Sequence, residues 1–381
     1  MMAGPNQGQT DQSLRHWFFS ILLAVIVATP GAAEPPQRVY RNELKPLANP
    51  TPLLADYPEL IHPIRESARF EGPALIDDPG ADLSVRGWRF SMNARAVIEM
   101  PNRLRGDKTA VVVVHPWGIN DGQGWRIPEP AGFAFGTPAT VDYIARHMRE
   151  VVNPLLKSLR GNVALVMYSM RGAEDPIRRR LYRSIRRRPT PVERKQAELD
   201  LTAKLRSFSY EAGSIPESLP LSQQNPVSDY FQQLPGGLFR DKYNGPGFWD
   251  LPIPIHSAID VAPDDVVFYD ADGYEALRDF LRREGVSHIL LCGYACTKCY
   301  RRTAAGYLNL EKDFNVFLVG DGTLEPTPMV DNIRFATSAA IAAASRDHLI
   351  TQASWIQVIP GQKVAPRSKE HSDEPKTSSR Q

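Results

Sequence analysis

One of the three cysteines in the chain, Cys299, occupies a place where a thiol can act as a nucleophile. The apolar run His288–Cys292 predicts a buried strand, and a turn of small residues leads from it into a helix that we expect to begin near Thr297. Cys299 therefore falls in the first turn of a helix, at the carboxyl end of a strand. Backbone N–H groups and the helix dipole at such a point stabilise a thiolate and can hold an oxyanion. The position favours covalent catalysis, although a small buried residue at a helix start also fits it.

The residues around Cys299 follow a recognisable spacing. Gly293, Cys296 and Cys299 resemble the glycine, the threonine and the nucleophilic cysteine of the isochorismatase-like cysteine hydrolases, and Thr303-Ala304 continues that pattern. The motif is specific at residues 288–323, and the order of strands and helices extends the resemblance over residues 105–360.

This resemblance implies a three-layer α/β/α fold with a mostly parallel, roughly six-stranded sheet. It implies an enzyme that hydrolyses a C–N bond of a small amide through an acyl-enzyme on Cys299, with the backbone amides of Ala295 and Cys299 as the oxyanion hole. It also makes a homo-oligomer an expectation.

The rest of the site departs from the family's pattern. The family has an aspartate as general base at the end of the first sheet strand, where the stretch AVVVVHPWGIND places His115. A histidine beside a cysteine can take the thiol proton and return it to the leaving amine. Asp121 and Glu129, folding back from the following loop, are alternative bases. The structural alternative for His115 is a strand-end histidine bonded to a backbone carbonyl.

The family's lysine, expected after the third strand, has no counterpart here. No lysine lies between Lys242 and Lys298, and Tyr269 and Asp270 occupy the region instead. We take these two residues, with Cys296, as candidates for auxiliary roles. With the family's aspartate replaced and its lysine missing, two hypotheses stay open: an active hydrolase, and a catalytically degenerate binding protein on the same fold.

Two further interpretations use other residues. Cys296 and Cys299 form a C-x-x-C, which is typical of thiol–disulfide exchange, and a disulfide would prevent Cys299 from acting as a nucleophile. Ser169 follows a strand as the serine of an α/β-hydrolase would. Met167 and Arg171, however, stand where the nucleophile elbow of those enzymes needs glycine.

Binding surfaces can be sought in aromatic and charged segments. Trp117, Trp125 and Phe133, on the loop after the first strand, are candidates for the wall of a substrate pocket. The basic segment Arg178–Arg188 could contact an anionic partner, or could be the solvated face of a basic helix. The histidines form no metal-binding motif, and Gly118–Gly124 lacks the lysine of a phosphate-binding loop, so we expect neither metal nor cofactor.

Length and composition limit the protein class. The chain has 381 residues, of which 42% are hydrophobic and 23% charged, with a formal net charge of +2. These fractions exclude a disordered, collagenous or multi-span membrane protein, and the balanced charge argues against a dedicated nucleic-acid binder. We therefore expect a soluble protein of α/β size, whose function must be inferred from local motifs.

The elements that position these residues follow from hydrophobic periodicity. Alternation from Trp88 to Met100 predicts a half-buried strand or hairpin. Continuous apolar runs predict strands buried on both faces of a parallel sheet, at Ala110–Val114, Val163–Met167, Val266–Phe268, Ile289–Leu291, Val316–Val319 and Trp355–Ile359. Helical spacing predicts helices at Thr140–Leu159, Gly273–Arg283, Lys298–Leu310 and Phe335–Ala344. A site is expected at the carboxyl ends of the strands.

The remaining segments define the domain organisation. Residues 1–33 have signal-peptide architecture with a cleavage site near Ala33, which predicts export to a periplasmic or extracellular location. An uncleaved signal that anchors the chain is the alternative. We expect an N-terminal β extension at 34–104, an α/β domain at 105–360 with an insertion at 172–262 that caps the strand ends, and a disordered tail at 361–381.

Overall fold

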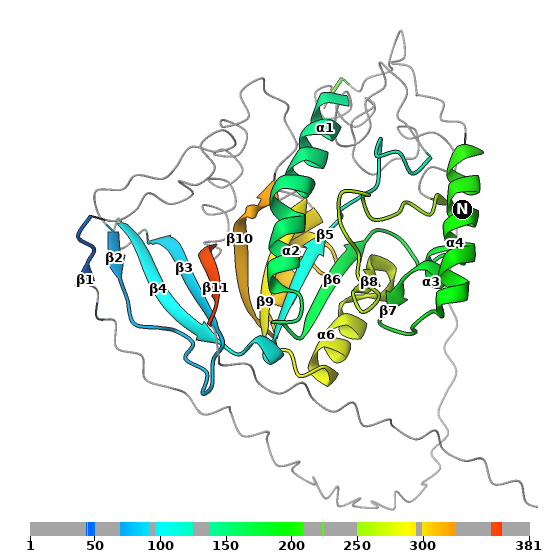
Figure 1. The fold of residues 1–381 in the computed structure, drawn as a ribbon. Helices are drawn as coiled ribbons and strands as arrows, with labels where there is room; N and C mark the ends of the chain where they lie inside the picture. Colours follow the sequence, from blue (N-terminus) through cyan, green and yellow to red (C-terminus); the bar gives the residue numbers. More distant parts are fainter. Residues whose placement is uncertain are drawn as a thin grey trace, which may run out of the picture. The chain divides into compact units, whose positions relative to one another are not determined.

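The computed structural model describes residues 43, 45–49, 69–91, 96–124, 138–208, 223–224, 250–294, 299–324 and 352–359. All of them belong to the unit Arg41–Gln381. Within these ranges the strands form one sheet of eleven, in the order β1-β2-β4-β3-β11-β10-β9-β5-β6-β8-β7 (Figure 1). The predicted signal segment, the tail from residue 361 and the predicted helix Phe335–Ala344 lie outside the described residues.

Six parallel strands form the centre of the sheet. In chain order they are β5 (Thr109–Val114), β6 (Leu165–Met170), β8 (Val266–Tyr269), β9 (His288–Tyr294), β10 (Asn315–Leu324) and β11 (Gln352–Val358). Neighbouring members of this group pair in parallel, so the spatial order is third, second, first, fourth, fifth, sixth. This is the order of a doubly wound sheet, which switches direction between its first and fourth strands. The six predicted parallel strands are confirmed, although in β11 Ile356 and Val358 are half-buried and Gln357 is exposed.

Helices cover both faces of this sheet. Alternate residues of one strand belong to different core clusters: Val111 and Val113 pack with α1, η2, α2 and α4, whereas Val112 and Val114 pack with α6, α7 and α8. The helices are α1 (Pro138–His147), η2 (Met148–Val152), α2 (Asn153–Leu159), α3 (Arg178–Leu181), α4 (Pro191–Arg206), α6 (Tyr274–Arg283), α7 (Cys299–Arg302) and α8 (Tyr307–Leu310). Two short 3-10 turns are η1 (Gly106–Lys108) and η4 (Asp270–Asp272). The predicted three-layer α/β/α fold is confirmed.

The N-terminal part extends the sheet beyond β11 (Figure 1). Strands β3 (Leu83–Ser91) and β4 (Ala96–Leu104) form an antiparallel hairpin, and β3 also pairs antiparallel with β11. Two short strands, β1 (Lys45–Pro46) and β2 (Arg69–Glu71), continue this edge. The opposite edge is β7 (Arg183–Ser184), which is parallel to β8.

One buried carboxylate interrupts the alternation of buried apolar and exposed polar residues in this hairpin. Glu99 is almost completely buried, although the alternation places it on the polar face. Arg69 and Arg86 both bind its carboxylate, and Arg86 also contacts Glu71 at 2.7 Å. A buried carboxylate needs such partners, because burial removes its hydration. Sequence alternation does not reveal a charge cluster of this kind.

The first predicted helix is one helical segment with an irregular turn. Helix α1 passes through the π-helical turn η2 into α2, where Pro154 occupies the first turn. Proline has no N–H to donate and its ring crowds the carbonyl four residues earlier, here that of Glu150. A wider turn at that point is the expected local response.

The predicted helix over Lys298–Leu310 is also divided. Helix α7 has only four residues, and α8 begins after Gly306, where a Cβ would lie 2.7 Å from the carbonyl carbon of Arg301. Residues 295–298, where that helix is predicted to begin, lie outside the described residues.

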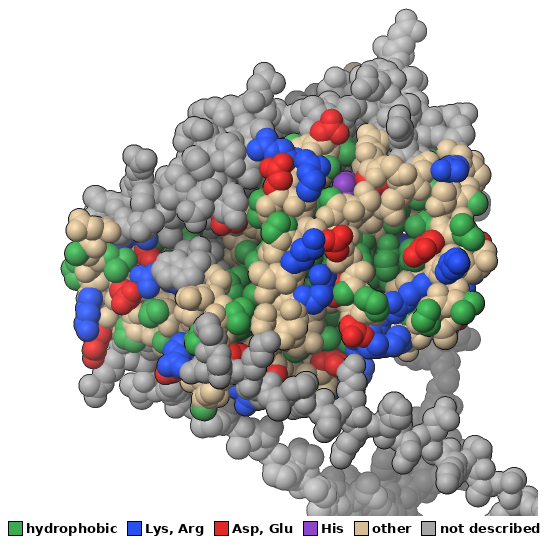
Figure 2. Space-filling model, in the orientation of Figure 1, with side chains coloured by type: hydrophobic (Ala, Val, Ile, Leu, Met, Phe, Trp, Pro, Cys, Tyr) green, Lys and Arg blue, Asp and Glu red, His purple; other side chains and the backbone are tan. Residues whose placement is uncertain are grey.

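The basic segment is mostly not helical. Within Arg178–Arg188 only α3 is a helix, and the edge strand β7 follows it. Most of its guanidinium groups are paired with carboxylates: Arg178 with Asp175, Arg180 with Asp200, Arg186 with Asp272, Arg187 with Glu193 and Arg188 with Asp264. On the face shown in Figure 2, basic and acidic side chains are mixed. Contact with an anionic partner stays a prediction.

None of the helices among the described residues combines the length and the hydropathy needed to cross a bilayer.

Candidate active site

His115 directly follows β5 and has an unusual backbone conformation. Its φ is 50°, in the left-handed region that side chains other than glycine avoid at a cost of about 1–2 kcal/mol. Its backbone N–H donates to the carbonyl of Ser169 at 2.9 Å, which ties the turn to the end of β6. The side chain is buried, with Trp117 stacked on the ring at a centroid distance of 4.9 Å. The turn therefore fixes the imidazole at the carboxyl edge of the sheet.

The imidazole is paired with a carboxylate. Its Nε2 lies 2.9 Å from Oδ2 of Asp270, the first residue after β8. The other carboxylate oxygen of Asp270 accepts a hydrogen bond from the Ser169 hydroxyl at 3.2 Å. Three neighbouring parallel strands, β5, β6 and β8, thus each contribute one residue to this group. The predicted backbone carbonyl partner of His115 is replaced by a carboxylate.

Cys299 lies beside the same imidazole. It carries a free thiol, is partly buried and packs against the core cluster that contains Val114. Burial opposes the charged imidazolium, but the hydrogen bond to Asp270 and charge interactions with Asp270 and Cys299 outweigh it and raise the pKa of His115 to about 9. Because Asp270 occupies Nε2, the nitrogen left for the thiol is Nδ1, which is buried and has no hydrogen-bond partner among the described residues. Cys299, His115 and Asp270 are therefore a candidate cysteine–histidine–aspartate triad, in which Nδ1 and the thiol are not joined by a hydrogen bond.

Gly293 lets the two central strands approach at this point. It lies opposite Val114 in the register of β5 and β9, and its φ is 115°. A Cβ on Gly293 would overlap the carbonyl oxygen of Val114 and lie 2.5 Å from its nitrogen. Only glycine fits here without displacement of a strand, so the residue that aligned with the motif also has a steric reason to be glycine.

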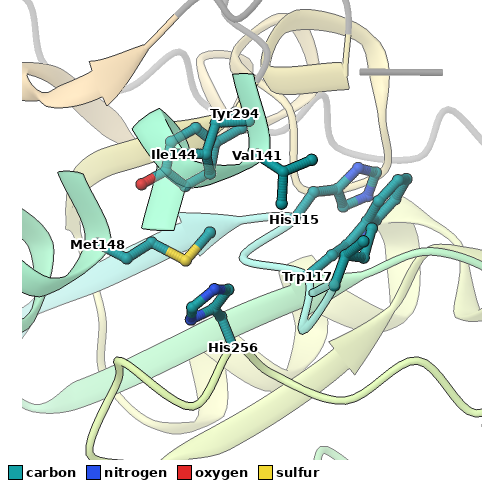
Figure 3. A pocket seen from close by; sticks show the side chains of 8 residues that line it. His115, Trp117, Val141, Ile144, Met148, His256 and Tyr294 are labelled. Atoms are coloured by element: carbon teal, nitrogen blue, oxygen red, sulfur yellow. The ribbon is translucent and has the colours of Figure 1, made fainter. Parts of the chain in front are cut away.

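A mostly apolar pocket lies next to His115 (Figure 3). The space in it that no protein atom occupies is about 370 Å³, including its open side. Besides His115 it is lined by Trp117, Ile119, Val141, Ile144, Met148, His256 and Tyr294. These residues come from the loop after β5, from α1 and η2, from the end of β9 and from the segment before β8. A pocket of this kind beside His115 is suited to a small apolar group.

Part of the 172–262 insertion forms one wall of the pocket. The backbone of Gly118 donates to Pro254 at 2.7 Å, and that of His256 donates to Pro116 at 2.9 Å. Asp121 accepts a hydrogen bond from the backbone of Ser257 at 2.9 Å. Asp121 therefore fastens the two loops together, and no hydrogen bond from it to His115 or Cys299 is found in the described residues.

A second buried histidine supports the pocket from behind. Nε2 of His147 donates to the carbonyl of Asp321 at 2.6 Å, so Nδ1 accepts a hydrogen bond from the Tyr294 hydroxyl at 2.8 Å. Burial lowers the pKa of His147 to about 4, so the ring is neutral at pH 7. Tyr294, the last described residue before the motif turn, is held in place by this contact.

Searches against known proteins give structural likeness only. No protein-family model and no curated protein matches the chain. Similar solved structures are a cysteine hydrolase from Pseudomonas syringae pv. phaseolicola, a pyrazinamidase from Pyrococcus horikoshii in complex with zinc and a nicotinamidase from Staphylococcus aureus. Their sequence identities are 15%, 15% and 10%, and their TM-scores are 0.32, 0.29 and 0.29. The matches cover 66%, 62% and 65% of this chain and 91%, 96% and 99% of those chains.

Likeness at such identities and TM-scores assigns no activity, and the fold assignment rests on the strand order and the layers described above.

Five of the other predicted site residues lie outside the described residues: Ala295, Cys296, Trp125, Phe133 and Glu129. Tyr269 is buried in the core with Arg178 over its ring at 4.9 Å, and it makes no described contact with the triad. Of the predicted pocket residues, Trp117 lines the pocket.

Two residues at the site were not predicted in their roles from the sequence, Ser169 and His256. Ser169 is fully buried and binds Asp270, which suits a positioning residue better than a hydrolase nucleophile. His256 stands in the proline-rich insertion, where no motif indicated it. No group of three or more His, Cys, Asp or Glu side chains in the described part of the chain is arranged to hold a metal ion.

Proposed function

We propose that the chain is a cysteine hydrolase that cleaves the C–N bond of a small amide through an acyl-enzyme on Cys299. His115 is the acid–base residue, and Asp270 orients it and stabilises its charge. The observation that supports this most strongly is the placement of His115, with Asp270 at 2.9 Å from Nε2 and Cys299 beside the ring. A nucleophile, a base and a group that orients the base are the parts that acyl transfer requires.

In this proposal a protonated His115 faces Cys299. A pKa of about 9 keeps His115 protonated at pH 7, and an adjacent positive charge is an environment in which cysteines act as nucleophiles. The negative charge of Asp270 supports the same imidazolium from the other side.

The proposed reaction has two halves. The Cys299 sulfur attacks the amide carbon, a C–S bond forms, and the carbonyl oxygen becomes an oxyanion. When the C–N bond breaks, Nδ1 of His115 gives its proton to the leaving amine, and a thioester remains. His115 then takes a proton from water, whose oxygen attacks the thioester. The C–S bond breaks, the carboxylic acid leaves, and His115 again faces a thiolate.

The exchange of residue types relative to the family pattern supports this proposal. The resemblance places an aspartate where this chain has His115, and a lysine in the region that Tyr269 and Asp270 occupy. A protonated His115 with Asp270 is still a pair of opposite charges at the site. Retention of a charge pair beside the cysteine favours a working site over a degenerate one.

The test is hydrolysis of a panel of small primary amides, followed by ammonia release, with the purified full chain. We expect turnover of at least one amide, loss of turnover in Cys299→Ala and His115→Gln, and an acyl adduct on the Cys299 peptide by mass spectrometry. Cys292→Ala is the matched control, because Cys292 is a buried thiol in β9 whose sulfur contacts the carbonyl of Val112 at 3.6 Å. Turnover that persists in Cys299→Ala, or an adduct on another residue, would contradict the mechanism.

We also propose that the protein is exported through residues 1–33. Fractionation of cells that express the full chain should recover it outside the cytoplasm and shortened near Ala33. A full-length chain in the cytoplasm would contradict export and would leave the hydrolase proposal unaffected.

A further inference from the structure

His256 is a buried histidine with one ring nitrogen that the protein does not use. Only 4% of the residue is exposed, and it lines the pocket opposite Tyr294 (Figure 3). Its Nε2 is buried and has no hydrogen-bond partner among the described residues. A buried polar atom without a partner costs about 1–3 kcal/mol, so such an atom at a pocket wall calls for an explanation.

The hydrogen bond at the other nitrogen fixes where the proton is. The backbone N–H of Ala258 donates to Nδ1 of His256 at 3.0 Å, so Nδ1 is an acceptor. Burial lowers the pKa of His256, although Asp121 opposes this, and the ring is therefore neutral at pH 7. The single proton of a neutral imidazole must then be on Nε2. His256 presents an N–H donor to the pocket.

The other polar groups of the pocket are already engaged. The Tyr294 hydroxyl is bonded to His147, and Nε2 of His115 is bonded to Asp270. The remaining nitrogen of His115 faces Cys299 in the proposed mechanism. Among the described residues that line the pocket, the other walls are mainly apolar and none is a lysine, arginine or carboxylate. The charge of a protonated His115 is already balanced by Asp270. A charged ligand group would therefore lose its hydration here without a counter-ion from these residues, whereas a neutral acceptor would gain a hydrogen bond from His256.

We infer that His256 determines the specificity of this pocket, and that its Nε2–H donates to one hydrogen-bond acceptor on an otherwise apolar, uncharged acyl group. The inference rests on the proposed function in one respect, because it takes the pocket as the acyl site of the Cys299 hydrolase. The substrate class that follows is a neutral amide whose acyl part carries a ketone or an ether oxygen as acceptor.

The test measures binding without turnover, in the full chain carrying Cys299→Ala. The probes are cyclohexanecarboxamides with a ketone at ring position 3 or 4, each paired with the analogue in which an exocyclic methylidene replaces the ketone oxygen. The members of a pair have nearly the same shape and differ in one acceptor. Dissociation constants are measured by isothermal titration calorimetry.

We expect at least one ketone to bind about three- to tenfold more tightly than its methylidene partner, which is the range for one neutral hydrogen bond. His256→Leu should reduce that ratio to about one, and His256→Gln, which keeps a donor, should restore part of it. Met148→Leu is the matched control, because it changes a pocket wall without changing a donor. Equal binding within both pairs, an unchanged ratio in His256→Leu, or no binding of any probe at millimolar concentration would overturn the inference.

A second measurement covers the case in which His256→Leu does not fold. In the Cys299→Ala chain, the proton on Nε2 of His256 should be visible by ¹⁵N-edited NMR and should move downfield when the ketone is added. No response to the ketone would overturn the inference as well. If the ketone binds more tightly than its methylidene partner but no amide is hydrolysed, His256 keeps its binding role and the hydrolase proposal is refuted. If amides are hydrolysed but the two analogues bind equally, the hydrolase proposal stands and the role of His256 is refuted.

Discussion

Nε2 of His115 lies 2.9 Å from Oδ2 of Asp270, although 155 positions separate the two residues in the chain. The contact joins the end of β5 to the residue that follows β8, and Ser169 at the end of β6 holds the second carboxylate oxygen. Parallel strands bring their carboxyl ends to one edge of the sheet, which is why residues so distant in sequence meet there. The contact gives His115 a fixed orientation and a negative partner.

Asp270→Asn removes the charge of this partner while keeping its shape. We expect amide hydrolysis to fall by about 10²-fold or more, because the amide neither stabilises the imidazolium nor fixes its tautomer. The measurement is kcat/KM on whichever amide the panel identifies. Asp272→Asn is the control, since Asp272 belongs to the same turn η4 but pairs with Arg186 at 2.6 Å. Equal losses of kcat/KM in the two variants would show that activity depends on the turn η4 and not on the contact between Asp270 and His115.

The pKa of His115 predicts the pH dependence of activity. Burial opposes the imidazolium, but Asp270 and Cys299 raise its pKa to about 9, and the leaving amine needs the proton that this group carries. Activity should therefore be lost as pH rises through about 9, and the alkaline limb should move to lower pH in Asp270→Asn. A pH–rate profile of kcat/KM checks both statements. An alkaline limb at the same pH in both proteins would contradict the role of Asp270.

The same shift makes a stability prediction with a defined sign. A histidine whose folded pKa exceeds its unfolded value of about 6.5 contributes stability that is complete below 6.5 and is lost as pH rises toward 9. By linkage the loss is about 3 kcal/mol in magnitude. Urea unfolding of the wild type and of His115→Gln between pH 6 and 9.5 should show the wild type losing more stability. If the free energies of unfolding of the two proteins change equally with pH, the raised pKa of His115 is contradicted.

The sequence predicted the fold better than the site, and particular residues explain the difference. Continuous apolar runs such as Ala110–Val114 mark buried strands, because both faces of a parallel sheet are covered. The same apolar run also predicted that His115 lies at the end of a strand. The pairing with Asp270 could only be proposed as an auxiliary role, since a hydrogen bond across the sheet has no local signal. His256 gave no signal at all, because its place depends on how the insertion folds back on Pro116.

Gly293→Ala should disrupt the site more than other glycine substitutions. Its Cβ would overlap the backbone of Val114, immediately before His115, and its φ of 115° is unfavourable for alanine. We expect loss of activity and a large loss in thermal stability. Gly161→Ala is the control, because Gly161 has a φ of 82° but nothing within 4 Å of the added Cβ. That variant should lose only about 1 kcal/mol, and equal effects would contradict the close approach of β5 and β9.

Removal of the buried carboxylate in the N-terminal hairpin should be costly. Glu99→Leu leaves Arg69 and Arg86 buried without their shared partner, and breaking such a cluster costs about 3–5 kcal/mol. Asp77→Ala breaks an exposed pair with Arg103 at 3.7 Å and should cost less than about 1 kcal/mol. Urea unfolding compares the two. A small effect of Glu99→Leu would show that the arginines find other partners or water.

The central claim is that His115 activates Cys299, and the rate of thiol alkylation tests it most directly. The full chain is treated with iodoacetamide at pH 7, and alkylation of each cysteine is followed by peptide mapping, with the buried Cys292 as an internal control. We predict that Cys299 reacts at least about tenfold faster in the wild type than in His115→Gln, because the imidazolium that favours the thiolate is absent from the variant. Equal rates of Cys299 alkylation in the two proteins would contradict the proposed mechanism.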